Sequence, residues 1–196
     1  MNQQHASSTH EFILVSNQQQ GYACGEVDSY FDELAADFDA LRQGHVGKTL
    51  HTSQDIRQVK FSAELGGYSI ADVDHALDRV EDRFADFERR YFIERYGRAK
   101  WEQSVEESAA VIMRRLDRQA GERFRRPARK LTKGYFVKEV DALCESLRDH
   151  FRSAEELSPS LIRSAVFSSA TGDMCYEETQ VDAFLDSCIA LILNLR

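Results

Sequence analysis

Apolar residues recur at helical spacing in four segments of the chain. Their positions are Val27, Phe31, Leu34, Phe38 and Leu41; Val73, Leu77, Val80 and Phe84; Val140, Leu143, Leu147 and Phe151; and Val181, Leu185, Ile189 and Ile192. Residues three and four apart lie on the same face of a helix, so each segment predicts an amphipathic helix. The clearest strand-like run, Phe12 to Val15, is too short to build a fold on. We therefore expect an all-α fold.

A short motif precedes each of these helices. It is a Gly-Tyr pair followed, five residues after the tyrosine, by Val-Asp. The motif residues are Gly21, Tyr22, Val27 and Asp28; Gly67, Tyr68, Val73 and Asp74; Gly134, Tyr135, Val140 and Asp141; and, without a glycine, Tyr176, Val181 and Asp182. The constant spacing predicts a repeat protein with four turn-plus-amphipathic-helix units.

Each motif residue type has a physical interpretation. Glycine suits a tight turn because it adopts backbone conformations that other residues resist. The motif aspartates are placed in the first helical turn, where negative charge meets the positive helix end. The residue before valine (Glu26, Asp72, Glu139 or Gln180) is placed to reach back to the amide at the start of the helix. We expect the tyrosines to pack on the helix starts, and Tyr68→Ala to cost roughly 3–5 kcal/mol if the ring is fully buried.

The repeats fall into two pairs. The second and fourth copies follow similar segments, Ile56 to Phe61 and Ile162 to Phe167, whereas the first and third begin at Phe12 and Phe124. This pattern favours a two-repeat module that has been doubled, with an enlarged middle. We expect a disordered tail over residues 1–10, a first repeat pair with the central segment over 11–120, and a second pair over 121–196.

The middle of the chain predicts one long helix or a helical hairpin. From Asp72 to about Ala120 the only helix-breaking residue is Gly97. The apolar seam that starts at Val73 continues through Phe84 to Tyr91. Aromatic residues as bulky as these are unusual in a thin two-stranded coiled coil. We therefore expect the seam to pack against the chain's own repeat helices and a second copy.

Charge is distributed unevenly. The chain has a formal net charge of −8, yet the stretch from position 114 to 133 contains nine basic residues and only two acidic ones, Asp117 and Glu122. The candidate residues for binding an anionic surface are Arg114, Arg115, Arg118, Arg123, Phe124, Arg125, Arg126, Arg129, Lys130, Leu131 and Lys133, in which Phe124 and Leu131 would add shallow insertion. Such a run is attracted to an acidic membrane leaflet. The alternative is that these arginines pair with acidic faces of the same or a neighbouring chain.

Several function classes lack their sequence signals. The chain has no phosphate-binding loop, no GxSxG elbow and no HExxH pair, so we expect neither an enzyme nor a cofactor. The four cysteines form no CxxC pair, which favours a reduced cytosolic protein without a metal site. The apolar run from Cys188 to Leu195 is too short to span a bilayer.

The motif Gly-Tyr-x-x-x-Glu-Val-Asp, preceded by Ile-Arg-x-x-x-Phe, resembles the DivIVA domain of Gram-positive, particularly actinobacterial, bacteria. The resemblance covers the four repeat units. It implies a cytoplasmic, self-associating scaffold of the cell-division and polar-growth type, often drawn to negatively curved membrane at the septum or pole. In that family an exposed aromatic residue and an arginine just before Gly-Tyr are assigned to membrane contact. Here only the third copy has a basic residue there, Lys133, with Leu131 nearby.

The sequence therefore predicts a non-enzymatic helical scaffold or adaptor. Its expected partners are further copies of itself, other division or growth scaffold proteins, and the surface of an anionic membrane. One alternative is a soluble regulatory protein that binds another helical protein without membrane contact. A more distant alternative is nucleic-acid binding through residues 114–133, although the net charge of −8 argues against it.

Overall fold

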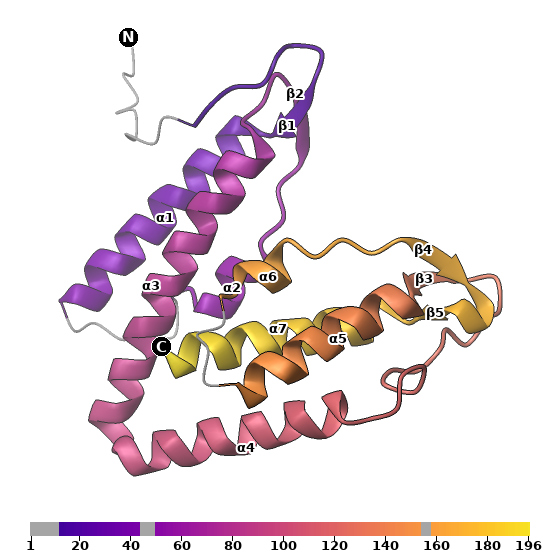
Figure 1. The fold of residues 1–196 in the computed structure, drawn as a ribbon. Helices are drawn as coiled ribbons and strands as arrows, with labels where there is room; N and C mark the ends of the chain where they lie inside the picture. Colours follow the sequence, from indigo (N-terminus) through magenta and orange to yellow (C-terminus); the bar gives the residue numbers. More distant parts are fainter. Residues whose placement is uncertain (1–11, 44–49, 154–157) are drawn as a thin grey trace, which may run out of the picture. The chain divides into compact units, whose positions relative to one another are not determined.

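The computed structural model describes residues 12–43, 50–153 and 158–196, so the expected disordered tail over residues 1–10 lies outside the described residues. The protein is rich in helix and also contains small antiparallel sheets (Figure 1). The mainly helical character is confirmed, and the small sheets are an addition that the sequence analysis did not predict. The chain divides into two compact units, Met1–Tyr91 (unit 1) and Phe92–Arg196 (unit 2).

Unit 1 contains two strands and the helices that follow them. Its elements are β1 (Gln20–Tyr22), α1 (Cys24–Arg42), α2 (Ser53–Gln58), β2 (Ala63–Leu65) and α3 (Ile70–Tyr96), whose last residues belong to unit 2. Strands β1 and β2 are antiparallel, with Gly21 opposite Glu64. The segment at Leu14 adds a single bridge to Tyr68. The strand-like run from Phe12 to Val15 therefore serves as an edge of this small sheet.

The core of unit 1 lies between α1, α2 and α3. Val27 and Phe31 of α1 pack with Val73 and Ala76 of α3, and a second cluster joins Leu34, Ile56 and Phe84. These residues come from the helical faces that the sequence pattern indicates. The apolar seam of α3 is thus covered, over its first half, by helices of the same chain.

Unit 2 has a similar order of elements after one additional helix. Its elements are α4 (Arg98–Leu116), β3 (Lys133–Phe136), α5 (Val137–Arg152), α6 (Ser160–Arg163), β4 (Ser169–Thr171), a 3₁₀ turn (Gly172–Met174), β5 (Cys175–Tyr176) and α7 (Glu178–Leu195). Strand β3 is central in an antiparallel sheet of order β4-β3-β5. Helices α5 and α7 begin directly after β3 and β5, as the motif predicts for the third and fourth copies.

The expected domain boundary after residue 120 is wrong. Helix α4 packs against α5 and α7, and its residues Ile112 and Leu116 are buried, so it belongs to unit 2. Helix α3 ends at Tyr96 because Gly97 has a φ of 91° and a ψ of 151°, a conformation restricted to glycine. The long central segment is therefore two helices with a break at Gly97.

Candidate functional site: the paired motifs and the basic end of unit 2

The motif tyrosines lie beside one another in pairs. In unit 1 the amide of Tyr22 donates to the carbonyl of Tyr68, and the amide of Tyr68 donates to the carbonyl of Tyr22, each at 2.9 Å. In unit 2, Tyr135 and Tyr176 are opposite each other in the β3–β5 pair. The first motif is therefore joined to the second, and the third to the fourth, by short antiparallel pairing.

Each tyrosine hydroxyl reaches the motif aspartate of its paired copy. Tyr22 donates to Asp74 at 3.1 Å, and Tyr68 donates to Asp28 at 3.4 Å. Tyr176 donates to Asp141 at 3.0 Å, and a side-chain hydrogen bond joins Tyr135 to Asp182. The four aspartates therefore accept tyrosine hydroxyls across the pair, a role that helix-start electrostatics does not predict. Tyr68 is only partly buried, so the cost expected for a fully buried ring does not apply to it.

The motif glycines are required by close approach, not by an unusual backbone angle. None of Gly21, Gly67 and Gly134 has a positive φ. A Cβ atom at Gly21 would lie 2.2 Å from the Tyr68 carbonyl oxygen, and one at Gly67 would lie 2.2 Å from that of Tyr22. At Gly134 the corresponding distance to the Tyr176 carbonyl is 2.1 Å. The expected turn conformation is therefore wrong, and steric room for the paired tyrosine is the reason for glycine.

A second set of contacts fixes the segment before each paired copy. The amide of Ser62 donates to Glu26 at 2.7 Å, while the Ser62 carbonyl accepts from the amide of Ala23 at 2.9 Å. The same pair of bonds occurs at the other three motifs. The amides of Ile13, Ser168 and Arg125 donate to the side chains of Asp72, Glu139 and Gln180, respectively. The carbonyls of the same three residues accept from the amides of Ser69, Phe136 and Glu177. The expected reach of these side chains to their own helix-start amides is therefore wrong. They bind the paired copy instead.

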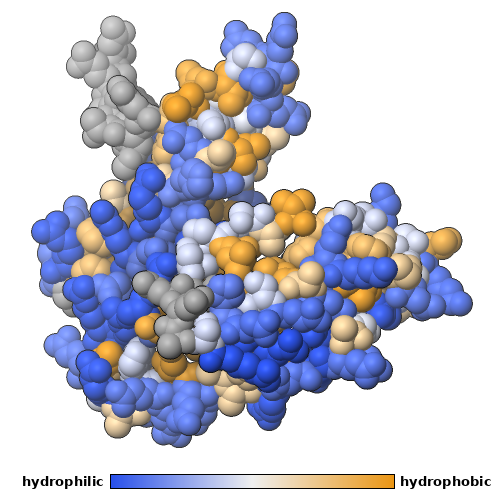
Figure 2. Space-filling view, in the orientation of Figure 1, coloured by the Kyte–Doolittle hydropathy of each residue, from blue (hydrophilic) through white to orange (hydrophobic). Residues whose placement is uncertain are grey.

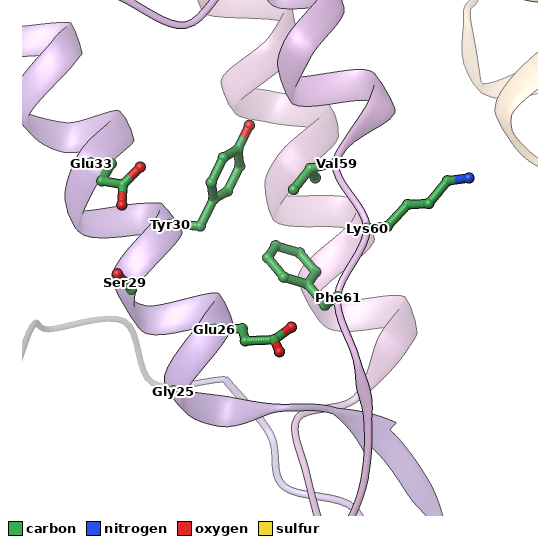
Figure 3. A pocket seen from close by; sticks show the side chains of 8 residues that line it. All are labelled: Gly25, Glu26, Ser29, Tyr30, Glu33, Val59, Lys60 and Phe61. Carbon is green, nitrogen blue, oxygen red and sulfur yellow. The ribbon is translucent and has the colours of Figure 1, made fainter.

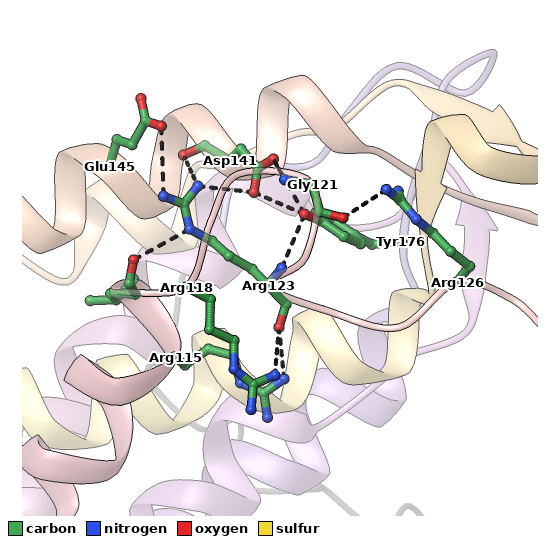
Figure 4. A network of polar contacts seen from close by, with 9 residues as sticks. Arg115, Arg118, Gly121, Arg123, Arg126, Asp141, Glu145 and Tyr176 are labelled. Atoms are coloured by element: carbon green, nitrogen blue, oxygen red, sulfur yellow. Dashed lines mark hydrogen bonds and ion pairs between the residues drawn. The ribbon is translucent and has the colours of Figure 1, made fainter.

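Unit 2 adds a buried arginine to this arrangement (Figure 4). Arg123 is 1% exposed and its guanidinium donates to the Asp141 carboxylate at 2.9 Å and to the Leu116 carbonyl at 3.4 Å. Glu145 lies 3.6 Å away and completes the ion-pair set. Asp141 also accepts from the Tyr176 hydroxyl and from the Gly121 amide. A charge this deeply buried is stable only because each of its partners is in place.

Burial removes two residues from the expected anionic-surface site. Arg123 is enclosed as described above, and Phe124 is 4% exposed, with its ring against those of Tyr176 and Phe184. Neither side chain is able to contact a membrane in this fold, so that assignment is wrong for both. The reason is that the segment before the third motif is itself part of the pairing with the fourth.

Four further basic residues contact their own chain. Arg115 and Arg118 donate to the Arg123 carbonyl, at 2.8 and 3.4 Å. Arg125 forms an ion pair with Glu177, and Arg126 donates to the carbonyls of Gly121 and Cys175 while its guanidinium lies over the Tyr176 ring. The alternative interpretation, in which arginines pair with acidic groups of the same chain, therefore applies to Arg123 and Arg125, whereas Arg115, Arg118 and Arg126 bind backbone carbonyls.

The rest of the basic stretch is exposed at one end of unit 2. Arg129, Lys130 and Lys133 are exposed, and Leu131 between them is 90% exposed. A turn closes this segment, since the Thr132 amide donates to the Arg129 carbonyl at 3.0 Å. Exposed Met174 belongs to the neighbouring turn, next to Cys175, whose thiol lies 3.9 Å from the Thr132 carbonyl. We call Arg129, Lys130, Leu131, Lys133 and Met174 the basic end; Arg114, also exposed, is on α4.

Burial and nearby carboxylates change the acidity of the motif tyrosines. Burial, followed by the charge of Asp141, raises the pKa of Tyr176 to about 12. Burial and Asp182 raise the pKa of Tyr135 to about 12 in the same way. For Tyr22 and Tyr68 burial again raises the pKa, with Asp74 and Asp28 as the second cause. All four tyrosines therefore remain protonated donors at neutral pH.

Unit 1 also has an open hollow of about 410 Å³ between α1 and residues 59–61 (Figure 3). Tyr30, Glu33 and Lys60 line it. The Tyr30 hydroxyl is buried and has no hydrogen-bond partner among the described residues, and burial raises the pKa of Tyr30 to about 12. The surrounding acidic side chains already bind the protein, as Glu26 does through Ser62, so we assign no ligand to the hollow.

Sequence reasoning missed the buried role of Arg123 and the exchange of contacts between paired motifs. The sequence feature connected with this exchange is the phenylalanine before each motif, because each of these rings contacts the tyrosine of the paired copy. Nothing in the sequence separates Arg123 from the exposed arginines near it. Their roles depend on which side of the chain faces α5 and α7.

Within residues 12–43, 50–153 and 158–196, no cluster of three or more His, Cys, Asp or Glu side chains is able to hold a metal ion. Among the helices in that part of the chain, none combines the length and apolar character needed to cross a bilayer. No protein-family model, no curated protein and no solved structure matches the chain.

Proposed function

We propose that the protein is a non-enzymatic scaffold or adaptor of the DivIVA type, acting near the cell-division or polar-growth machinery. It is built from two copies of a two-motif module, connected through α3 and α4. It works by self-association and by contact of the basic end of unit 2 with an anionic membrane surface. The exposure of that basic end carries the proposal.

The paired motifs support a binding role rather than a chemical one. Their tyrosines, aspartates and N-terminal acidic side chains are engaged in contacts within each unit. Those contacts hold short loops firmly on the starts of long helices. A rigid support of this kind presents the basic end in one conformation, which lowers the entropy lost when it binds.

The composition of the basic end suits a lipid surface. Three cationic side chains surround an aliphatic side chain that is 90% exposed, and Met174 adds a second apolar group. Each lysine or arginine near an acidic leaflet contributes about 1 kcal/mol, so three contribute about 3 kcal/mol at moderate salt. Burying Leu131 among acyl chains adds an attraction that salt does not screen.

Liposome flotation tests the proposal. The test variant replaces Arg129, Lys130 and Lys133 by Gln, and its matched control replaces Arg98, Lys100 and Arg114, exposed residues of α4, by Gln with the same change in charge. We expect the wild type and the control to float with anionic vesicles, and the test variant to lose roughly a hundredfold in apparent affinity. Leu131→Ser should weaken binding that survives at high salt, whereas Val166→Ser, also at 90% exposure, should not.

Other results would redirect the proposal. Well-folded wild type that does not float would favour the soluble regulatory alternative, in which the basic end binds an acidic protein partner. Binding to duplex DNA with no binding to vesicles would favour the nucleic-acid alternative. Equal losses in the test variant and in its control would mean that general charge, and not the basic end, carries the attraction.

A further inference from the structure

Two segments at one end of unit 1 contain no charged residue, although the unit is acidic and the Asp72 carboxylate accepts from the Ile13 amide at their border. Residues 1–91 contain 8 Lys and Arg against 16 Asp and Glu, a difference of −8. The whole chain is also −8, so unit 2 is formally neutral. Residues 12–25 and 65–71 contain no charge. We call residues 12–20 and 65–70 the uncharged end.

Hydrogen bonds bring the two segments of the uncharged end together. The Ser69 amide donates to the Ile13 carbonyl at 2.7 Å, and the Val15 amide donates to the Gly67 carbonyl at 2.9 Å. Gln20 is paired with Leu65 in the small sheet. Four large aliphatic side chains are exposed on these segments. They are Ile13 at 68%, Leu14 at 61%, Leu65 at 64% and Ile70 at 45%.

Asn17, Gln18, Gln19 and Gln20, which carry side-chain amides, are exposed at the end of the first segment. Figure 2 shows apolar surface gathered, beside hydrophilic surface, over the part of unit 1 that carries β1, β2 and the start of α3. Aliphatic and amide side chains therefore share one exposed surface.

The matching positions of unit 2 are polar or charged. Aligning the motif tyrosines and the preceding phenylalanines places Ile13 and Leu14 opposite Arg125 and Arg126, and Ile70 opposite Glu178. Leu65, opposite Gln20 in unit 1, corresponds to Thr171, opposite Lys133 in unit 2. Three of the four exposed aliphatic residues of unit 1 therefore have charged counterparts in unit 2, and the fourth has a polar one. Neither the folding of the motif nor its pairing requires aliphatic residues at these positions.

Charge repulsion distinguishes between two candidate partners of this surface, an anionic membrane and a second copy of unit 1. An anionic membrane would repel a unit with a charge of −8, and the uncharged end has no lysine or arginine to offset that repulsion. A second copy of unit 1 meets the same repulsion on its charged faces and least of it at the uncharged end. Asparagine and glutamine side chains both donate and accept hydrogen bonds, so a row of them is complementary to itself.

We infer that the uncharged end of unit 1 is the interface between two copies of this chain. The contact is isologous, with the same surface contributed by both copies, so the assembly closes as a dimer. This inference deepens the proposed self-association. It rests on unit 1, whereas the membrane proposal rests on unit 2, and either one can fail alone.

The test is the mass of the full chain in solution, measured by analytical ultracentrifugation over a range of concentrations at low and high salt. We expect a concentration-dependent species of twice the 22.4 kDa chain mass that persists at high salt. Leu14→Ser should raise the dimer dissociation constant at least roughly tenfold, because a twofold contact loses the side chain twice. Val111→Ser is the matched control, with 59% exposure on α4, and should leave the constant unchanged.

A second pair of variants separates charge from packing. Gln18→Glu adds one negative charge at the uncharged end without changing side-chain shape, and should weaken the dimer. Gln119→Glu makes the same change at an exposed position of unit 2 and should have no effect. Both positions are exposed, so the fold tolerates the substitutions.

Three outcomes would overturn the inference. They are a monomer at every concentration, a dimer indifferent to both Leu14→Ser and Gln18→Glu, and a dimer that dissociates as salt is raised. Flotation of the wild type with uncharged vesicles that is lost in Leu14→Ser would assign the surface to lipid instead.

Discussion

In both units each motif tyrosine donates its hydroxyl to the aspartate of the paired motif, but the surroundings of these contacts differ. In unit 1 the contact of Tyr22 with Asp74 lies at the surface. In unit 2 the contact of Tyr176 with Asp141 is buried, and Arg123 neutralises the carboxylate. The backbone pairing of the tyrosines is common to both units. The pairing therefore specifies the shape of the module, while the surroundings decide how strongly each contact contributes to stability.

The comparison also separates the two units by the character of their exposed surfaces. Unit 1 has an exposed aliphatic and amide surface within an acidic unit, and unit 2 has an exposed basic loop within a neutral one. The surface beside the paired motifs is uncharged in unit 1 and cationic in unit 2. We interpret the two units as having separate partners.

The largest effect expected is that of Arg123→Met. It leaves the Asp141 carboxylate buried without its cation, which should destabilise unit 2 by about 3–5 kcal/mol. Trp101, the only tryptophan of the chain, is in unit 2, so denaturant unfolding followed by its fluorescence measures that unit. Arg152→Met removes the exposed ion pair with Asp117 and should cost under about 1 kcal/mol.

A double variant checks the cause assigned to the Arg123 effect. Arg123→Met combined with Asp141→Asn removes both buried charges and keeps an acceptor for the Tyr176 hydroxyl, so it should recover part of the lost stability. Failure of the double variant to recover any stability would mean that the shape of the arginine, and not its charge, supports the unit.

Truncating the tyrosines should give a smaller difference between the units. Tyr176 is fully buried, so Tyr176→Ala should cost about 3–5 kcal/mol. Tyr68 is partly exposed, so Tyr68→Ala should cost about 2 kcal/mol. Thermal melts followed by circular dichroism report both units, and Trp101 fluorescence identifies unit 2. Equal costs would show that burial does not distinguish the two modules.

Alkaline pH should produce the smallest effect. The pKa of Tyr176 is raised from 10 to about 12 in the folded protein, so the folded state holds the proton more tightly than the unfolded chain. This contribution to stability is complete below about pH 10 and is lost as the pH rises through about 12. We expect unit 2 to be less stable near pH 11 than near pH 9, as followed by Trp101 fluorescence.

Tyr176→Phe should make this pH dependence smaller, since phenylalanine does not titrate. Tyr96→Phe, at an exposed tyrosine, is the control and should leave it unchanged. An identical alkaline loss in the wild type and in Tyr176→Phe would assign the effect to other groups, of which Tyr135 is the first to examine.

Much of the local structure followed from the sequence. The helical spacing that begins at Val27, Val73, Val140 and Val181 predicted four helices, and each valine is buried in its helix. These predictions succeeded because the period of the apolar positions and the residues at a helix start act over a few neighbouring residues.

The partners of the motif side chains did not follow from the sequence. Glu26 binds Ser62 instead of its own helix start, and Gly67 is required by the Tyr22 carbonyl and not by its own dihedral angles. Both contacts connect segments about 40 residues apart. A local interpretation of the motif assigns these roles to neighbours in sequence, although the paired copy supplies them.

By itself the sequence determined the four helices, the motif before each of them, and the uneven distribution of charge, because each of these is a property of residue type and spacing. Tertiary structure alone decided which arginines are buried, which aspartate each tyrosine reaches, and where unit 1 ends. Those outcomes depend on the approach of distant segments. Within the segment that connects α4 to β3, Arg123 is buried inside unit 2 and Lys130 is exposed.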